Sequence, residues 1–267
     1  MRIPARRIAP GRGEGTVLVS SAPFSFVGGV DPVSGTILDE ATGSRGADLR
    51  GRIFAFPTGK GSTVGSYVLY GMARRGTAPS AIVNERAEAI GAAGAVLGGV
   101  PMVDRVDLGV FLAGDRAVVD ADHGAVDLPD VQARPVVSAF LRNRGRVLVV
   151  RRSERVGSFR GRWSAISGYL EGGEDPRDRA RSEILEETGI KGARFRRAGE
   201  PVVTRHGSTA FVVHPFLFDV PTRSVRLDWE NVESRWIAPG DLPTLRTVPR
   251  LGDVLSLVLD SPGVRKR

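Results

Sequence analysis

A group of three glutamates near residue 185 has the residue type and spacing to bind a metal ion. Glu183 lies three residues before Glu186 and four before Glu187, so a helix places all three on one face. Carboxylates this close repel unless a cation lies between them, and Mg2+ or Mn2+ prefers oxygen ligands and recruits phosphates. The alternative is a solvated acidic face whose charge is partly offset by the preceding arginines. The spacing favours the metal site.

The helix that would carry these glutamates has clear start and stop signals. Asp175 is a good N-cap, Pro176 suits the first helical position, and Gly189 closes the helix. Outside the acidic face, three apolar residues are expected to pack inward: Ala180, Ile184 and Leu185.

The same stretch resembles the signature of the Nudix family, G-x5-E-x7-R-E-U-x-E-E-x-G-U, where U is apolar. The residues that fall on it in register are Gly168, Glu174, Glu183, Ile184, Glu186, Glu187, Gly189 and Ile190. One position departs, because Ser182 stands where the signature has arginine. The hairpin before the signature and Glu233–Leu242 after it also resemble the family, so the resemblance covers roughly residues 133–260. It implies an α/β/α sandwich.

This resemblance implies metal-assisted hydrolysis of a diphosphate linked to another group, X. The metal, Mg2+ or Mn2+, would be held by Glu183, Glu186 and Glu187, with Glu183 and Glu187 acting in catalysis. Gly168 and Glu174 would shape the loop before the helix.

The departure at Ser182 changes how that loop is braced. In the family, the first glutamate of the signature pairs with the signature arginine. Glu174 therefore needs another partner, for which Arg179 and Arg181 are candidates. The metal face is intact, whereas the rigidity of the loop, and with it activity, depends on that partner.

The substrate of this half stays open among nucleotide, sugar and lipid diphosphates. Five residues outside the motif are plausible contacts, each with a core or surface role as the alternative: Arg162, Trp163, Arg205, His206 and Phe211. His214 lies beside Pro215 in an apolar strand and is interpreted as structural.

A second stretch, FPTGKGSTVGSY, carries different chemistry. It passes from a strand to a helix through residues 59–63, where glycines let a ligand approach backbone amides that attract anions. It is not a P-loop, because Phe54 stands where that motif needs its first glycine and Gly61 where it needs Ser or Thr. Taken alone, the stretch is equally an ordinary capped turn.

Three blocks around this turn resemble the small, swivelling part of the aconitase X family. They comprise residues 25–39, 51–84 and 99–104, within a resemblance that covers roughly residues 3–128. The resemblance implies that Ser62 is catalytic, taking or giving a proton as water is lost. Lys60, Gly61 and Thr63 would bind the substrate and stabilise the anion of the serine.

The aconitase X resemblance also implies a partner. In many archaea this part is a separate small subunit that acts with a large subunit as phosphomevalonate dehydratase, converting 5-phosphomevalonate to trans-anhydromevalonate 5-phosphate on the way to isoprenoids. The chain has no cysteine, so it cannot supply the usual thiolate ligands of an iron–sulfur cluster. A heterodimer is therefore expected, in which the phosphomevalonate dehydratase large subunit holds the cluster.

The order of predicted elements indicates an α/β protein of two domains, residues 1–130 and 131–267. The first, a swivelling β/β/α domain, is predicted to alternate strands and helices with parallel pairing at 52–57, 64–76, 80–84, 85–94 and 95–103, followed by hairpins over 109–128. Asp127–Pro135 is predicted to be a linker. The Nudix sandwich is predicted to have a hairpin around Asn143–Gly145, strands at 211–220 and 224–229, and a helix at 248–260.

Charge and hydropathy limit the remaining classes of function. The net charge of +8 comes almost wholly from arginines spread along the chain, which genomic composition explains as well as nucleic-acid binding does. No apolar run approaches the roughly 20 residues that span a bilayer, so a cytoplasmic protein without membrane contact is expected. Two alternatives stay open: a Nudix hydrolase with a non-catalytic N-terminal binding or scaffold module, and an arginine-rich nucleic-acid-binding protein.

Overall fold

The computed structural model divides the chain into two compact units, Met1–Gln132 and Ala133–Arg267, and describes residues 1–259. Each unit has its own sheet and its own apolar core. Within residues 1–259, no helix combines the length and apolar character that crossing a membrane requires.

An eight-stranded sheet forms the first unit, in the order β1-β8-β7-β3-β4-β5-β6-β2. The strands are β1 (Arg2–Pro4), β2 (Arg6–Ala9), β3 (Arg12–Val19), β4 (Arg52–Phe56), β5 (Ala81–Asn84), β6 (Met102–Asp104), β7 (Arg116–Asp120) and β8 (Ala125–Asp127). The pairs β3–β4, β4–β5 and β5–β6 are parallel, and the others are antiparallel. This confirms the parallel alternation and the hairpin predicted after it.

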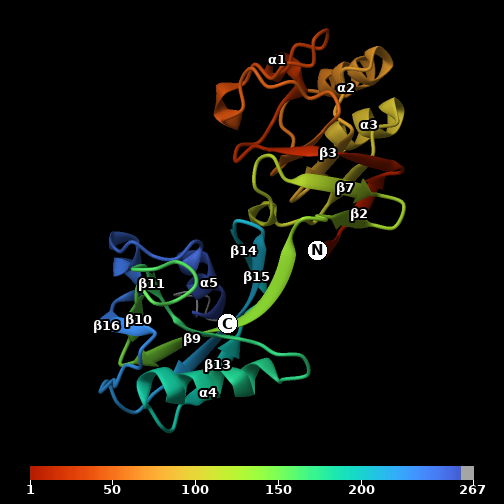
Figure 1. Cartoon of the computed structure of the whole chain (residues 1–267). Coiled ribbons are helices and arrows are strands. Elements are labelled where there is room, and N and C mark those ends of the chain that lie inside the picture. Colours follow the sequence, from red (N-terminus) through yellow and green to blue (C-terminus); the bar gives the residue numbers. More distant parts are fainter. Residues whose placement is uncertain (260–267) are drawn as a thin grey trace, which may run out of the picture. The chain divides into compact units, whose positions relative to one another are not determined.

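Two helices connect the parallel strands and lie side by side (Figure 1). The first, α2 (Val64–Arg75), lies where the sequence predicts it and ends at Gly76 in the left-handed conformation. The second, α3 (Ala89–Gly98), begins later than the predicted range 85–94, because the Glu88 side chain caps it by accepting from Ile90 N at 2.6 Å. The shorter elements are α1 (Phe26–Gly29), η1 (Glu40–Thr42) and η2 (Leu108–Val110).

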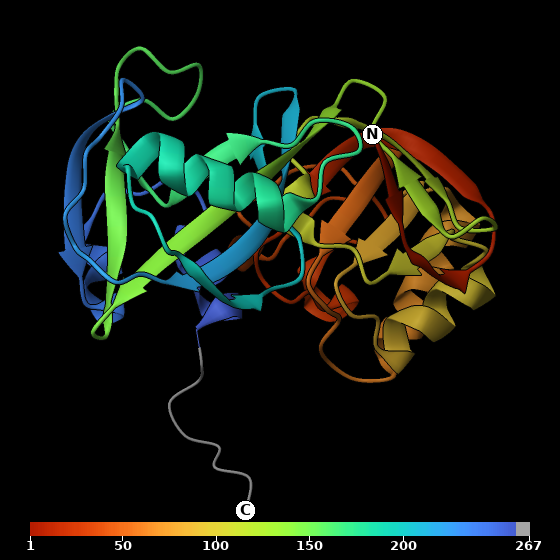
Figure 2. The same cartoon turned by 90° about the horizontal axis from the view of Figure 1, so that it is seen from below.

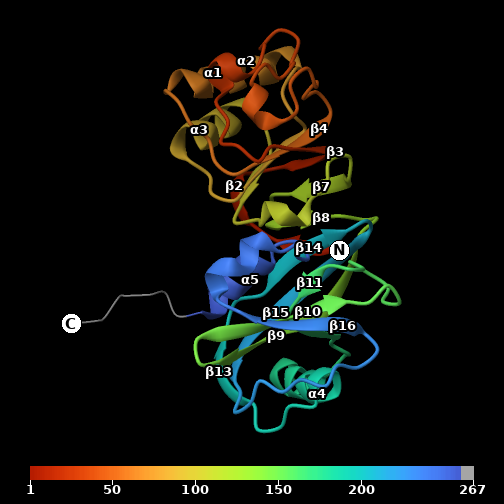
Figure 3. The ribbon, with the colours of Figure 1, turned by 90° about the vertical axis from the view of Figure 1, so that its left-hand side faces the viewer.

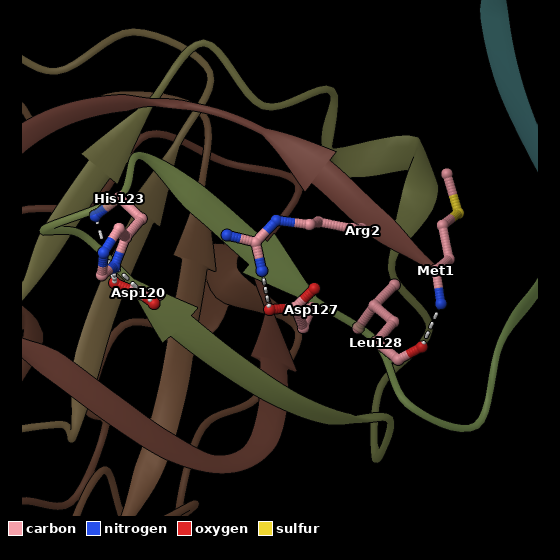
Figure 4. Close-up of polar contacts among 6 residues, drawn as sticks. All are labelled: Met1, Arg2, Asp120, His123, Asp127 and Leu128. Atoms are coloured by element: carbon pink, nitrogen blue, oxygen red, sulfur yellow. Dashed lines mark hydrogen bonds and ion pairs between the residues drawn. The ribbon is translucent and has the colours of Figure 1, made fainter.

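The linker predicted over Asp127–Pro135 is wrong in extent. β8 ends at Asp127 and β9 (Gln132–Asn143) begins at Gln132, so only residues 128–131 separate the strands. Leu128 is buried, and its carbonyl accepts from the terminal amine of Met1 at 2.7 Å (Figure 4). Arg2 donates to Asp127 at 2.8 Å beside it. Burial and pairing fix a segment whose composition is typical of a flexible connection.

The second unit is built on another eight-stranded sheet. Its path is β11-β10-β9-β15-β13, with β12 on β9, β14 on β15 and β16 on β10. The strands after β9 are β10 (Arg146–Arg152), β11 (Trp163–Ser164), β12 (Ile166–Tyr169), β13 (Arg194–Ala198), β14 (Val202–His206), β15 (Thr209–Asp219) and β16 (Asn231–Ile237). The predicted hairpin joins β9 to β10 through Arg144 and Gly145, both with positive φ.

Helices cover both faces of this sheet, α4 (Pro176–Thr188) on one and α5 (Leu251–Val258) on the other (Figure 3). Side chains alternate along a strand, so Phe140 packs with the α5 core and its neighbours Ala139 and Leu141 pack with the α4 core. Figure 2 shows α4 lying across the strands. The α/β/α sandwich is confirmed.

One predicted strand does not form. Residues 224–229 are irregular, because Arg226 N donates to Thr188 O at 2.9 Å and so caps the end of α4. Val225 and Leu227 pack against the α4 core from there. The following segment contains β16 and the 3-10 helix η3 (Pro239–Thr244). Of the helix predicted over 248–260, Leu251–Val258 forms α5, and residue 260 lies outside the described residues.

Candidate active sites

The acidic helix α4 forms as its capping residues predict. Asp175 accepts from Arg177 N at 2.9 Å and from Asp178 N at 3.0 Å, and Gly189 adopts the left-handed conformation after the last turn. Ala180 and Ile184 are buried, as expected. Leu185 is 48% exposed, so the expectation that it packs inward is wrong: it lies about 100° around the helix from Ile184 and faces away from the sheet.

The three glutamates on α4 differ in burial. Glu187 is only 3% exposed, and both its oxygens are used: Oε1 accepts from Ser167 N at 2.9 Å and Oε2 from the Asn231 amide at 2.6 Å. Glu183 is 5% exposed, whereas the Glu186 side chain is 56% exposed. α4 therefore presents two buried carboxylates beside one at the surface.

Burial of these carboxylates changes their acidity. Burial raises the pKa of Glu187 to about 8; the hydrogen bond from Ser167 lowers it, and the nearby charge of Glu183 raises it further. The pKa of Glu183 is also raised, mainly by burial, although Arg179 opposes the shift. Glu230, from the loop before β16, has a raised pKa as well, through burial and then the charge of Asp228. A group of carboxylates whose pKa values are raised together is typical of a functional site.

Arg179 is the cation that faces this group. Its guanidinium pairs with Glu183 Oε1 and lies 3.9 Å from Glu186 Oε2. Its Nε is buried without a hydrogen-bond partner in the described part of the chain. The guanidinium of Arg179 therefore lies between the carboxylates of Glu183 and Glu186 and reduces the repulsion between them, as a metal ion at the same place would.

The donor chemistry of the site suits a divalent cation. All candidate ligands are carboxylate oxygens, which Mg2+ and Mn2+ prefer. Across residues 1–259, no three Asp, Glu, His or Cys side chains are already grouped to hold a metal ion. Glu183 and Glu186 bind Arg179 instead, so metal binding there requires the arginine to move.

The loop before α4 is braced differently from the prediction. Arg181 pairs with Asp178 at 3.3 Å and Arg179 pairs with Glu183, so neither arginine binds Glu174. Glu174 instead accepts from the backbone N–H of Glu171 at 2.8 Å, within the loop itself. The expected arginine partner of Glu174 is thus wrong, because Arg179 binds the buried Glu183 and Arg181 binds Asp178.

Gly168 brings the strand β12 against α4. The Cβ of any side chain at this position would overlap Oε1 and Cδ of Glu183. Only glycine leaves room for the Glu183 carboxylate to lie against the strand.

A pocket of about 480 Å³ opens beside these carboxylates. Its charged lining consists of Arg152, Glu171, Glu174, Arg179, Glu183, Glu186 and Glu230. The rest is apolar or hydroxylic, with walls from β9, β14, β15 and α5. A concave site with a few convergent charged groups is the usual form of a small-molecule site.

Of the five suggested substrate contacts, two lie at or near the pocket and three have other roles. Phe211 lines the pocket, and His206 lies near it, with its ring 4.8 Å from that of the lining residue Phe159. Trp163 belongs to the core, with the Arg235 guanidinium 4.8 Å from its ring. Arg162 donates to Thr247 O at 3.1 Å and Arg205 to Gly207 O at 2.8 Å, so both stabilise loops.

His214 is half-buried, and burial lowers its pKa.

The sequence analysis missed three residues of the site: the lining residues Ser164 and Glu230, and Asn231, which binds Glu187. They lie outside the signature and meet the helix only through the fold.

In the first unit, Ser62 lies at the surface just before α2. Residues 60–64 are all exposed, and the Ser62 carbonyl accepts from Gly65 N at 2.9 Å in the first turn. Thr63 is the N-cap residue, but its side chain makes no capping bond. The serine is therefore within reach of a ligand or of another polypeptide.

Lys60 and Gly61 precede this serine in the same exposed turn. Lys60 Nζ lies 3.7 Å from Asp39 Oδ2 and lines a shallow hollow of about 510 Å³ together with Val27 and Leu38. Gly61 has φ +116°, and a side chain there would meet the Ser25 hydroxyl at 2.8 Å. The turn is thus a glycine-dependent approach to an open concave surface.

Comparison with known proteins gives two family matches, one for each half of the chain. Residues 2–128 match the model of the aconitase X swivel domain, and residues 132–258 match that of the NUDIX domain.

Curated relatives match the first half. The phosphomevalonate dehydratase small subunit of Methanocaldococcus jannaschii is 49% identical over 128 residues, covering 48% of this chain and 98% of that protein. The protein of the same name from Thermococcus onnurineus is 45% identical over 130 residues, covering 49% of this chain and 100% of that protein.

Solved structures resemble each half separately. Thermococcus kodakaraensis aconitase X in its holo-form is 45% identical, with a TM-score of 0.47, and covers 48% of this chain and 98% of that chain. A MutT protein from Methanosarcina mazei Go1 is 25% identical, with a TM-score of 0.42, and covers 47% of this chain and 92% of that chain.

Fold and motif together define a swivelling α/β domain followed by a hydrolase-type α/β/α sandwich. The chain belongs to the aconitase X swivel family through residues 2–128, and it carries a NUDIX domain in residues 132–258.

Proposed function

We propose that the chain joins parts of two enzymes. Residues 131–267 hydrolyse a diphosphate linked to X with Mg2+ or Mn2+. Residues 1–130 act as the small subunit of a phosphomevalonate dehydratase, together with a separate large subunit. The observation that carries the first part is the buried Glu183 at the charged side of a pocket large enough for a metabolite, with the buried Glu187 held next to it by the lining residue Ser167.

For the hydrolase, the proposal assigns Glu183, Glu186 and Glu187 as metal ligands. When bound, the metal would polarise the phosphates and make a bound water more acidic. Ser167 and Asn231 fix Glu187 by donating to its two oxygens, so this carboxylate is oriented before substrate arrives. Arg152, held by Ser158 O at 3.1 Å, supplies positive charge in the same pocket for a phosphate oxygen.

Glu187→Gln tests this assignment. The substitution removes a negative charge and replaces one acceptor by a donor that faces Ser167 N–H or the Asn231 amide. We expect phosphate release from a panel of diphosphates to fall by about 100-fold or more, as for other groups that act directly on the reaction. Glu200→Gln, at an exposed position, is the matched control and keeps full activity. Normal activity of Glu187→Gln, with wild-type melting, would remove Glu187 from the site.

For the dehydratase, the proposal rests on the family and on the exposure of Ser62. The serine would take or give a proton as the substrate loses water, and the amides at the start of α2 with Lys60 would stabilise its anion. The iron–sulfur cluster belongs to the large subunit in this proposal. The exposed apolar residues Val27 and Leu38 beside Lys60 are suited to contact that subunit.

Ser62→Ala tests the dehydratase assignment. Since Ser62 is exposed, its truncation leaves the fold unchanged, and we expect the dehydration rate of the complex with the large subunit to fall by about 100-fold or more. The exposed Ser208→Ala is the control for a lost hydroxyl. An unchanged rate would mean that the first unit serves as a binding or scaffold module.

A further inference from the structure

The pocket beside α4 is lined by two kinds of surface from different elements. Its charged residues come from β10, the loop before α4, α4 itself and Glu230. Its apolar wall is formed by Ala165, Phe211, Val213, Val248, Leu251 and Val254. The charged surface suits the diphosphate of the proposed substrate, so the apolar wall is left for the X group.

The apolar wall is continuous and well supported. Val213, Val248, Leu251 and Val254 pack together in the core between the sheet and α5. Phe211 is paired with Thr204 across β14 and β15, and its ring lies 5.9 Å from that of Phe159. A surface that belongs to the core stays in place without a ligand and loses little freedom when one binds.

One polar group in the pocket has nothing to bind. The Ser164 hydroxyl is buried without a hydrogen-bond partner in the described part of the chain, and Ser164 is only 4% exposed. Ser164 lines the pocket. Buried hydroxyls are normally paired, so this one is available to an oxygen of the ligand.

Outside the charged surface, the polar side chains of the pocket are hydroxyls only: Ser138, Ser158, Ser164, Ser167, Tyr169 and Thr204. Among the described lining residues there is no Asn, Gln, Asp, Lys or His, and every carboxylate belongs to the charged surface. A base or sugar buried against the apolar wall would leave several donors and acceptors unpaired, which is costly, whereas an alkyl or alkenyl chain leaves none.

We propose, on the basis of the hydrolase function above, that X is an apolar chain and that the substrates are diphosphate monoesters of apolar alcohols, of the prenyl type. Water attacks the terminal phosphorus, and the bond between that phosphorus and the bridging oxygen breaks. The bridging oxygen takes up one proton from the water, and the products are the alcohol monophosphate and inorganic phosphate. Ser164 donates to an oxygen of the bound ligand.

The experiment compares substrates of the two chemistries on the full chain with Mg2+. Dimethylallyl and geranyl diphosphate are set against ADP, ADP-ribose and UDP-glucose, and kcat/KM is measured from the monophosphate formed. We expect geranyl diphosphate to exceed each nucleotide by at least about 10-fold. A preference for a nucleotide, with its base stacked on Phe159 and Phe211, would overturn the inference and leave the hydrolase in place. Inactivity on the whole panel would instead contradict the hydrolase.

Two variants test the pocket contacts directly. Ser164→Ala removes no hydrogen bond of the protein itself, so its melting temperature is expected to hold, while KM for geranyl diphosphate rises about 5- to 10-fold at constant kcat. Val213→Asn puts an amide into the wall and is expected to weaken binding of the non-cleavable geranyl methylenediphosphonate, measured by thermal shift.

Val232→Asn, at a position 56% exposed, is the matched control and leaves binding unchanged. An unchanged KM in Ser164→Ala together with unchanged binding in Val213→Asn would refute the assignment.

Discussion

At the scale of single residues, the balance of charge beside α4 decides the behaviour of the hydrolase site. Glu183 and Glu187 are buried carboxylates with raised pKa values, and Arg179 is shared between Glu183 and the exposed Glu186. Arg179 lies four residues before Glu183, one turn back on the same helix. Its guanidinium therefore supplies the positive charge beside Glu183 that a metal ion would otherwise supply. It also stands where the proposed metal would bind.

Arg179→Gln is therefore expected to tighten Mg2+ binding. Removing the guanidinium ends its competition for Glu183 and Glu186, and an ion pair of about 1 kcal/mol corresponds to a gain of about fivefold. Isothermal titration with Mg2+ measures the affinity, and the melting temperature without Mg2+ is expected to fall. Arg181→Gln, which loses only an exposed pair with Asp178, is the control. Weaker Mg2+ binding in Arg179→Gln would show that the arginine supports the ion instead.

At the scale of elements, the contact of β12 with α4 positions the Glu183 carboxylate. The loop between them carries its own hydrogen bond, from the backbone N–H of Glu171 to the Glu174 carboxylate. Gly168 is the point of closest approach, since any Cβ there would overlap Glu183. The strand, the loop and the helix thus act as one unit in placing the acidic group.

Gly168→Ala tests that contact. The methyl group forces Glu183 out of its buried position, so we expect a loss of about 2–3 kcal/mol in the free energy of unfolding together with the loss of hydrolysis. Chemical denaturation measures the first and phosphate release the second. Gly172→Ala is a close control, because nothing lies within 4 Å of a Cβ at that position. Wild-type stability of Gly168→Ala would mean that Glu183 is free to leave the strand.

At the scale of the whole chain, each unit is stabilised by apolar cores of its own. The core around Phe24, Phe54 and Phe56 contains residues of the first unit alone, and the two cores about the second sheet lie wholly within the second unit. Chains of this length bury enough apolar surface to fold independently. Two proposed activities with unrelated chemistry therefore share one polypeptide without sharing a core.

Separate fragments of residues 1–132 and 133–267 are thus expected to fold. Each should melt cooperatively, and Mg2+ should raise the melting temperature of the second fragment only, because the carboxylates of α4 belong to it. Scanning calorimetry of both fragments, with and without Mg2+, makes the comparison. Failure of either fragment to fold would show that the units depend on each other.

Local signals in the sequence predicted most of the elements and the class of each half. Capping residues located α4, glycines located the turn before α2, and the alternation of strands and helices predicted the parallel sheet, because these signals act over a few residues. The same local signals misjudged Leu185, the segment 224–229 and the linker, where burial and long-range pairing decide.

Only the tertiary structure brought distant residues to the site. Asn231 reaches Glu187 from 44 positions away, and the Ser164 hydroxyl becomes available because no neighbour pairs with it. Arg179 pairs with Glu183 and not with Glu174, which no motif could reveal. The strength of an ion pair depends on the burial of its partners, and burial is a property of the folded chain. Motifs identify groups capable of chemistry, whereas distance and burial, which belong to the folded chain, decide which of those groups meet.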